Sequence, residues 1–211
     1  MKLRLLLAAA VLLPAVSAVR AQTASAPADS PSGNSAGNQF GIYLNPIAIR
    51  ISNSVKDTSS FSFLGTSDTS RVFWGVDYGM YYDFLHTGAI TVGADLRAAN
   101  LHANNASLKD LLVGVRVSGQ VGQSAWHPYA EAMIGGGWTK APASAISVRK
   151  VQYQGFVGVD RPIGKHVDLR AIEAGYGSLH TISSATVGNG GNVSIPASSL
   201  LSISSGLVFR F

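Results

Sequence analysis

Cysteine is absent from this chain of 211 residues, and charged residues are scarce. The lack of cysteine excludes disulfide bonds, thiolate catalysis and cysteine-ligated zinc. Only 13% of the residues are charged, whereas a typical soluble domain carries about 25%. A deficit of this size indicates that much of the folded surface does not face water.

Long apolar runs are also missing after the N-terminal region. A membrane-spanning helix needs about 20 consecutive apolar residues, and the sequence beyond residue 21 contains no such run. Only helices and closed barrels can satisfy their backbone hydrogen bonds in lipid. Low charge without a spanning helix therefore leaves either a soluble β-protein or a membrane β-barrel.

The N-terminus is typical of a secretory signal peptide. Lys2 and Arg4 precede an apolar stretch at residues 5–16, and small residues that suit a cleavage site end at Ala21, with Ala18 as the alternative. Residues 1–21 are therefore predicted to be a cleaved signal for export. Residues 22–38, rich in Ala, Ser, Pro, Gly and Asn, are predicted to form a flexible periplasmic linker.

The net charge of +5 overstates how basic the exported protein is. Lys2, Arg4 and Arg20 lie in the predicted leader, which leaves 13 basic and 11 acidic residues, a balance of +2. No cluster of basic residues remains to neutralise phosphates, so nucleic acid is not expected as a partner.

Residues 39–211 show an alternation with a period of two, which predicts β-strands rather than helices. Residues 72–84 are the clearest case, with large apolar residues on one face and glycines and a few isolated charges on the other. The solvent face of a soluble sandwich would carry many Lys and Glu, whereas a barrel in lipid turns its apolar residues outward. We predict an all-β fold, an eight-stranded antiparallel up-and-down transmembrane β-barrel, with strands at residues 40–52, 72–84, 89–100, 110–122, 128–139, 150–162, 167–178 and 199–211.

Two strands are less regular. In the first, Ile47, Ile49 and Ile51 are expected to face outward and Arg50 inward, with a bulge or kink at Pro46. In the seventh, the alternation changes phase near residues 171–172, and a bulge there would turn Arg170 and Glu173 to the same side.

The connections are expected to alternate between short and long. Residues 85–88, 123–127 and 163–166 are short, whereas residues 53–70, 101–109, 140–149 and 179–198 are longer and polar. Transmembrane barrels have short periplasmic turns and long outer loops. This pattern places both termini in the periplasm.

Aromatic residues are predicted to form a girdle at each membrane interface. The outer girdle comprises Trp74, Trp138, Tyr153 and Tyr176, and the inner one includes Tyr82, Phe84 and Tyr129.

The last strand ends in alternating apolar residues, Leu207, Phe209 and Phe211. A strand with an exposed edge and an aromatic end can add to another sheet, so these residues are predicted to be a signal for the outer-membrane assembly machinery. With them, residues 128–137 (Pro-Tyr-Ala-Glu through Gly-Gly-Gly) and 158–176 (from Gly-Val-Asp to Tyr176) resemble the OmpA-like family of eight-stranded outer-membrane barrels. The resemblance covers residues 40–211, and it implies a barrel domain in the bacterial outer membrane.

Charges on the inward face are predicted to form a structural ion network, because buried charges are very costly unless paired. Its predicted members are Arg50, Asp77, Asp95, Arg97, Arg116, Glu131, Asp160, Arg170 and Arg210. An eight-stranded barrel is just wide enough for side chains to fill it. A narrow gated pore is the functional alternative.

A catalytic site is not expected. The one suggestive cluster is His180 with Ser183 and Ser184, but serine is abundant throughout the chain, and the histidines are not spaced as metal ligands. We therefore predict a non-enzymatic protein without cofactor or metal. Outer-membrane lipid surrounds it, and it has a structural role or presents surface loops to an unknown partner. A small channel or ligand carrier and a lipid A-modifying hydrolase are the alternatives.

Overall fold

The computed structural model describes residues 40–54, 56, 62–65, 68–142, 147–181 and 197–211. The predicted signal peptide and the predicted linker lie outside this part of the chain. The described strands are β1 (Phe40–Asn53), β2 (Ser70–Thr87), β3 (Ile90–Ala103), β4 (Ala106–Gly119), β5 (His127–Lys140), β6 (Ser147–Pro162), β7 (Val167–Thr181) and β8 (Ser198–Arg210).

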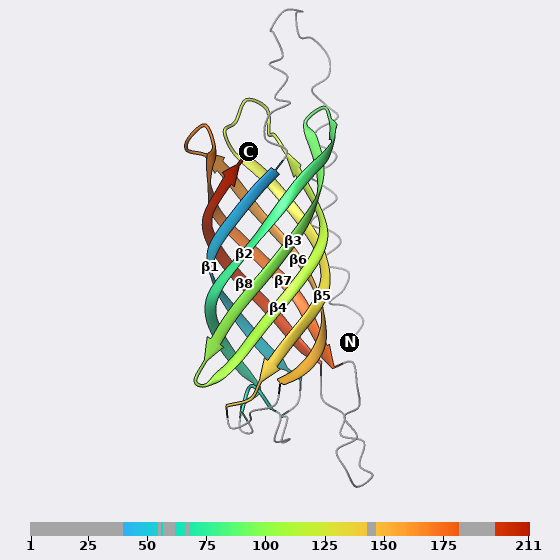
Figure 1. Cartoon of the computed structure of the whole chain (residues 1–211), viewed down its shortest axis with the longest axis vertical. Coiled ribbons are helices and arrows are strands. Elements are labelled where there is room, and N and C mark those ends of the chain that lie inside the picture. Colours follow the sequence, from blue (N-terminus) through green and yellow to red (C-terminus); the bar gives the residue numbers. More distant parts are fainter. Residues whose placement is uncertain (1–39, 55, 57–61, 66–67, 143–146, 182–196) are drawn as a thin grey trace, which may run out of the picture. The chain divides into compact units, whose positions relative to one another are not determined.

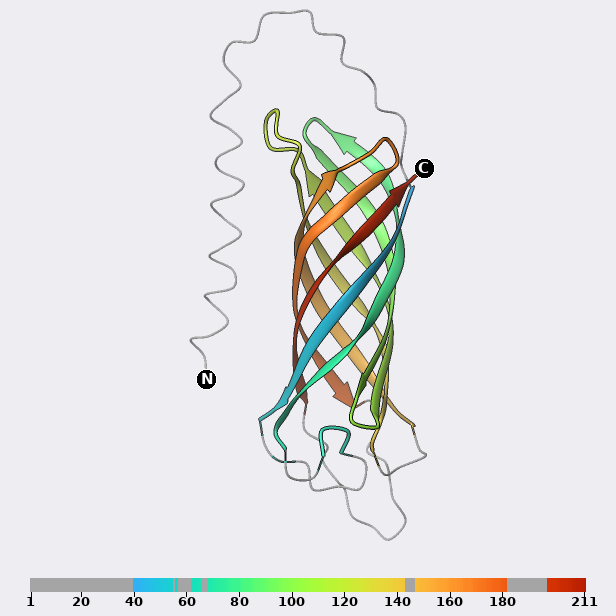
Figure 2. The same ribbon diagram turned by 90° about the vertical axis from the view of Figure 1, so that its left-hand side faces the viewer.

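Each strand pairs antiparallel with the next, and β8 pairs with β1 to close the sheet into a barrel, as Figures 1 and 2 show. The predicted all-β, eight-stranded up-and-down barrel is confirmed. The strands have 13 to 18 residues, more than the 9–11 or so that cross a bilayer. Each strand therefore extends beyond the hydrocarbon on at least one side. Among the described residues, no helix is long and apolar enough to cross a membrane.

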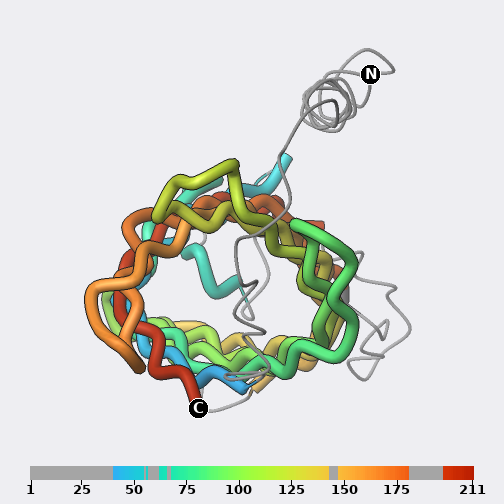
Figure 3. The backbone as a smooth tube through the Cα atoms, turned by 90° about the horizontal axis from the view of Figure 1, so that it is seen from above, coloured from blue at the N-terminus to red at the C-terminus, as the bar shows by residue number. Residues whose placement is uncertain are grey.

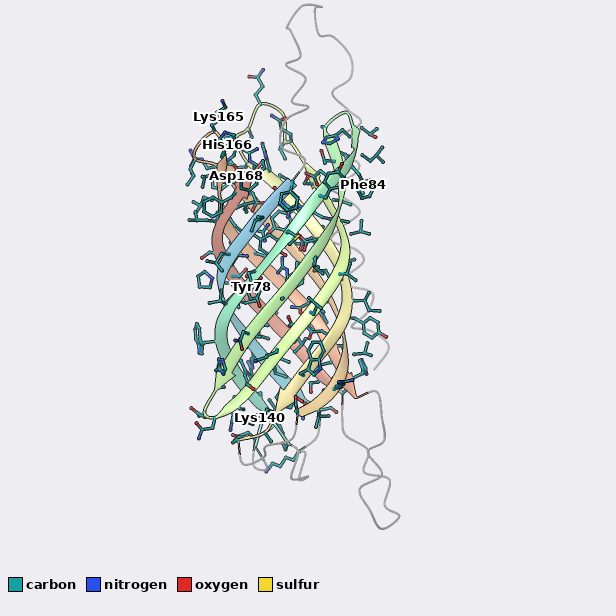
Figure 4. All side chains as sticks on the ribbon, viewed as in Figure 1. Tyr78, Phe84, Lys140, Lys165, His166 and Asp168 are labelled. Carbon is teal, nitrogen blue, oxygen red and sulfur yellow. The ribbon has the colours of Figure 1, made fainter. Side chains whose placement is uncertain are left out.

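The two ends of the barrel differ in their connections. The terminal end carries Phe40, Phe211 and the β2–β3, β4–β5 and β6–β7 connections, and the loop end carries the other four. In Figure 4, Lys165 and Phe84 lie toward the terminal end and Lys140 lies at the loop end.

The outer face of the wall is apolar from β2 to β8, as predicted. On β2, Trp74 is 66% exposed and Tyr78, Met80 and Tyr82 are exposed beside it, while Asp77 between them is fully buried. The same alternation continues around the barrel. Apolar residues therefore face lipid, and the charged residues in the middle of the strands face inward, whereas Lys109, Lys140, Arg149 and Arg161 are exposed near strand ends.

The predicted orientation of β1 is wrong. Ile47, Ile49 and Ile51 are buried inside the barrel and Arg50 is exposed outside. Pairing with β2 passes Pro46 without a change of register, so the predicted bulge is absent. The prediction assumed a uniformly polar interior, but the interior near the loop end is apolar, and β1 supplies isoleucines to it.

The predicted bulge in β7 is confirmed. The register shifts between Arg170 and Glu173 against β8, and between Val159 and Asp160 against β6. Because of the extra residue, Arg170 and Glu173 both point inward and are both buried.

The predicted strict alternation of short and long connections is wrong. The stretch at 101–109, predicted as a long loop, is a tight turn in which only Asn104 and Asn105 lie outside the strands. Both have positive φ, 43° and 65°, which a two-residue hairpin turn of type I′ requires and asparagine tolerates. The β4–β5 connection, predicted to be short, extends over residues 120–126.

Candidate functional site in the barrel interior

Three buried arginines form the centre of the interior. Arg97, Arg116 and Arg170 come from β3, β4 and β7, and none is more than 3% exposed. Arg97 donates to both carboxylate oxygens of Glu173, at 2.7 Å each, and it also binds Asp77 at 3.0 Å and Glu131 at 2.9 Å. Such paired contacts between a guanidinium and a carboxylate are the strong, directional form of ion pair.

The other two arginines connect this cluster around the barrel. Arg116 bridges Glu131 and Asp160, at 2.8 Å to each. Arg170 binds Asp160 at 3.1 Å and Glu173 at 3.2 Å. The ion pairs thus join β2 to β7 through one continuous set of contacts.

Aromatic rings cover the faces of the guanidinium groups. Arg97 lies 3.9 Å from the ring centroid of Phe156, and Arg116 lies 3.9 Å from that of Tyr129. Arg170 lies 4.5 Å from the ring of Tyr43. Each guanidinium therefore uses its edge for carboxylates and its face for a ring, and both contacts favour the buried charge.

Glycines on the inner wall make room for these rings. A Cβ atom on Gly158 would lie 2.5 Å from the ring of Tyr129, and one on Gly79 would lie 2.3 Å from the hydroxyl of Tyr43. No side chain fits at that distance without a shift of the ring. Part of the high glycine content, 23 residues, is therefore a condition of filling the interior with aromatic residues.

The structure brings together six of the nine residues predicted for the ion network: Asp77, Arg97, Arg116, Glu131, Asp160 and Arg170. Asp95 lies beside them and accepts a hydrogen bond of 2.7 Å from Tyr43. Arg210 instead pairs with Asp168 at 2.8 Å at the terminal end. Arg50 faces outward, where it donates a hydrogen bond to the hydroxyl of Ser70.

Two important residues were missing from the predicted ion network. Glu173 was expected only to lie on the same side as Arg170, and it accepts hydrogen bonds from Arg97, Arg170, Tyr129 and Ser204. Tyr129, predicted to lie in the inner girdle, is 4% exposed and lies inside. Its spacing of two residues from Glu131 was the signal that it faces inward.

A chain of hydrogen bonds between polar side chains lies next to the ion network. Gln152 donates to Asp110 at 3.1 Å and to Gln154 at 2.8 Å, and Gln154 donates to Ser202 at 3.0 Å. These four residues come from β4, β6 and β8 and are all buried. They extend the polar filling of the barrel beyond the arginines and connect β6 with β8.

The loop end of the interior is closed by an apolar cap. Phe63 and Leu64, from the β1–β2 connection, are 2% and 0% exposed, and Figure 3 shows a short segment of this connection inside the outline of the barrel. The ring of Phe63 lies 5.8 Å from that of Phe73. The buried members of the cap are Ile47, Ile49, Ile51, Phe63, Leu64, Phe73, Ala99, Leu101, Ala106, Leu108, Leu179 and Leu200.

Of the serine–histidine cluster noted in the sequence, only His180 lies within the described residues, since Ser183 and Ser184 do not. His180 shares a 2.6 Å hydrogen bond with Ser178. The His180 ring also meets Tyr153 edge-on, with centroids 6.1 Å apart. None of the nine acidic residues in the described chain forms a hydrogen bond or an ion pair with His180. The described residues also contain no group of side chains suited to a metal ion.

Several outward aromatic residues lie toward the two ends of the wall, whereas Tyr78 lies midway along it. Trp74, Tyr153 and Tyr176 are exposed toward the loop end, where Trp138 is half-buried, and Tyr82 and Phe84 are exposed toward the terminal end. The three residues of the predicted assembly signal, Leu207, Phe209 and Phe211, are exposed on the outside of β8 or just after it.

No protein-family model and no curated protein sequence matches the chain. Among solved structures, Neisserial surface protein A is similar, with a TM-score of 0.50 and 16% identity over 83% of this chain and 99% of that one. Ail of Yersinia pestis (TM-score 0.48, 12% identity, 83% and 99% covered) and OprG from Pseudomonas aeruginosa (0.41, 12%, 83% and 97%) are also similar. At these identities the likeness shows the fold alone. The fold is that of a small eight-stranded outer-membrane β-barrel.

Proposed function

We propose that this protein is a non-enzymatic component of the bacterial outer membrane that acts through its outer wall and its loop end, while its interior serves only to hold the barrel closed. The observation that carries this proposal is the filled interior. Arginine–carboxylate pairs and aromatic rings occupy one part, and the apolar cap occupies the other. An interior in which the three arginines are paired with carboxylates and covered by rings is suited to holding the wall together rather than to binding a solute.

The proposal includes the route and orientation predicted from the sequence. Residues 1–21 would direct export and be removed, residues 22–38 would form a periplasmic linker, and the terminal end would face the periplasm. The exposed residues Leu207, Phe209 and Phe211 would be read by the assembly machinery. Loops on a rigid scaffold commonly carry function, and the loop end would then present its connections outside the cell to a partner.

The first test is a gel of residues 22–211 refolded in detergent, run with and without boiling. A compact barrel held by its ladder hydrogen bonds migrates faster before boiling, and we expect that shift. No shift, together with solubility in the absence of detergent, would contradict a membrane barrel.

A small channel is the main competing function, and planar bilayers separate it from the proposal. We expect no stepwise ion conductance from the refolded protein, because both halves of the interior are filled. Reproducible single-channel steps that vanish when the protein is omitted would overturn the proposed role of the interior.

A lipid hydrolase is the other competing function, because Ser178 and His180 share a hydrogen bond. A nucleophilic serine also needs its histidine to be oriented by a third group, and the described carboxylates of the wall are directed inward. We expect lipid A incubated with the protein to keep its mass. A loss of one acyl chain that disappears in His180→Ala would refute the non-enzymatic proposal.

A further inference from the structure

A groove of about 370 Å³ lies on the outside of the wall across β5, β6 and β7. Its lining includes Ala132, Tyr153, Gly155, Tyr176 and Ser178. The volume is within the range of about 300–1,000 Å³ that is common for small-ligand sites. This feature lies on the lipid-facing side, separate from the filled interior.

The hollow follows from the order of small and large residues across the three strands. Gly155 pairs with Ala132 on one side and Tyr176 on the other, and Tyr153 precedes it by two residues on the same face. Gly155 has no side chain, so the floor is bare backbone between two exposed tyrosines. The result is an open apolar groove along the wall, flanked by the two tyrosines.

The loop-end side of the groove is polar. Ser178 lines the groove, and its hydroxyl shares the 2.6 Å hydrogen bond with Nε2 of His180, an exposed residue. The hydrogen bond between them uses only part of the hydrogen-bonding capacity of the hydroxyl and the imidazole, so both can also bond to a ligand. The contact between His180 and Tyr153 holds the imidazole next to the groove.

The charge around this side is positive. Arg149 on β6 and Lys140 on β5 are exposed near the same end of the strands. The acidic residues of the described strands are all buried or half-buried. The surroundings of the groove therefore favour a ligand that combines an apolar chain with a negatively charged head.

We propose that this groove binds a phosphorylated, acylated lipid of the outer leaflet. One acyl chain lies over Gly155 between Tyr153 and Tyr176, and the head group meets Ser178 and His180. The proposal rests on the orientation given under the proposed function, because that orientation places the loop end in the outer leaflet. Lipid is the occupant because the groove opens on the wall that faces the bilayer.

The experiment uses the protein reconstituted in phosphatidylcholine vesicles that contain a minor share of lipid A. The photoreactive residue p-benzoylphenylalanine replaces Tyr176 in one sample. In a matched control it replaces Tyr78, an exposed tyrosine on β2 away from the groove strands. After illumination, mass spectrometry measures what fraction of the cross-linked lipid is lipid A.

We expect lipid A to be enriched above its share of the vesicle at position 176 and to match its share at position 78. Gly155→Leu should abolish the enrichment by filling the groove. A Cβ atom there has only the carbonyl oxygen of Glu131 nearby, at 3.7 Å, so the wall accommodates the change. Ser178→Ala and His180→Ala should each reduce it.

Equal fractions of lipid A at positions 176 and 78, or enrichment that persists in Gly155→Leu, would overturn the proposal. Cross-linking of position 176 to a second copy of the chain would overturn it as well, because the occupant would then be protein. Every sample is also run unboiled. A retained mobility shift with no enrichment rejects the groove alone, whereas a lost shift indicates failure of the barrel itself.

Discussion

Removal of one carboxylate from the ion network should lower the stability of the barrel strongly. Glu131 is the informative position, because its two oxygens bind different arginines, Arg97 at 2.9 Å and Arg116 at 2.8 Å. In Glu131→Ala, Arg97 keeps Asp77 and Glu173, whereas Arg116 keeps Asp160 alone. Breaking a buried pair costs roughly 3–5 kcal/mol, and the contacts that remain place our expectation near 3 kcal/mol.

Glu131→Gln should be milder. The amide keeps the size of the side chain and one oxygen that can accept from a guanidinium, so no cavity forms. Its loss of charge weakens one hydrogen bond to a guanidinium, and its amide nitrogen cannot accept the other, each bond being worth about 1.5–3 kcal/mol when intact. Five buried carboxylates surround the three arginines, counting Asp95, so removal of one negative charge also relieves repulsion among them. We expect a loss of about 1–2 kcal/mol.

The assay is urea unfolding of the protein refolded in lipid vesicles, followed by tryptophan fluorescence and by the fraction of compact band on an unboiled gel. Equal slopes against urea for parent and variants would show that the midpoints report stability. A cycle with Arg116→Met should give a coupling energy of about 1–3 kcal/mol between positions 131 and 116. If the free energy of unfolding of Glu131→Ala lies within about 0.5 kcal/mol of that of the parent, the ion network does not stabilise the barrel.

Three further predictions concern the filling of the barrel and its assembly. Gly158→Ala should destabilise the fold by about 1–3 kcal/mol through overpacking against Tyr129, while Gly155→Ala, with its nearest atom at 3.7 Å, should change the urea midpoint little. Phe63→Ala should cost about 3–5 kcal/mol and yet give no conductance in planar bilayers, since the ion network still fills the terminal half; open-channel steps would contradict this. Phe211→Ala should slow assembly in cells, seen as a delayed compact band, but should leave refolding in detergent unchanged; equal delays in both settings would count against an assembly signal.

Alternation along single strands was enough to predict most of the wall. On β2 every second residue from Val72 to Phe84 is large and apolar, and only one assignment of faces places Asp77 out of lipid. The same argument predicted the inward direction of Arg97, Arg116 and Glu131. Placing a charged side chain on the face that contacts lipid costs so much free energy that the local sequence determines how each of these strands is oriented.

The reasoning failed on β1, where Arg50 was predicted to face inward although it lies near the loop end of the strand and is exposed. In β1 the isoleucines could serve either side, and their burial depends on the apolar cap, which Phe63 and Leu64 complete from a loop. The turn at Asn104 and Asn105 was predicted as a long loop because residues 101–109 contain several polar residues; these belong to the ends of β3 and β4.

The sequence by itself determined the fold class, the number of strands and the inward direction of most charges, because a period of two and the cost of charge in lipid act on each strand separately. Only the tertiary structure decided which charges meet. Closure of the barrel places Glu173 of β7 across the interior from Arg97 of β3, 76 positions away, and no local pattern encodes that contact. It likewise decided that Tyr129 covers Arg116, that a loop closes the interior, and that Gly155 lies between two tyrosines, since each depends on neighbours that other strands supply.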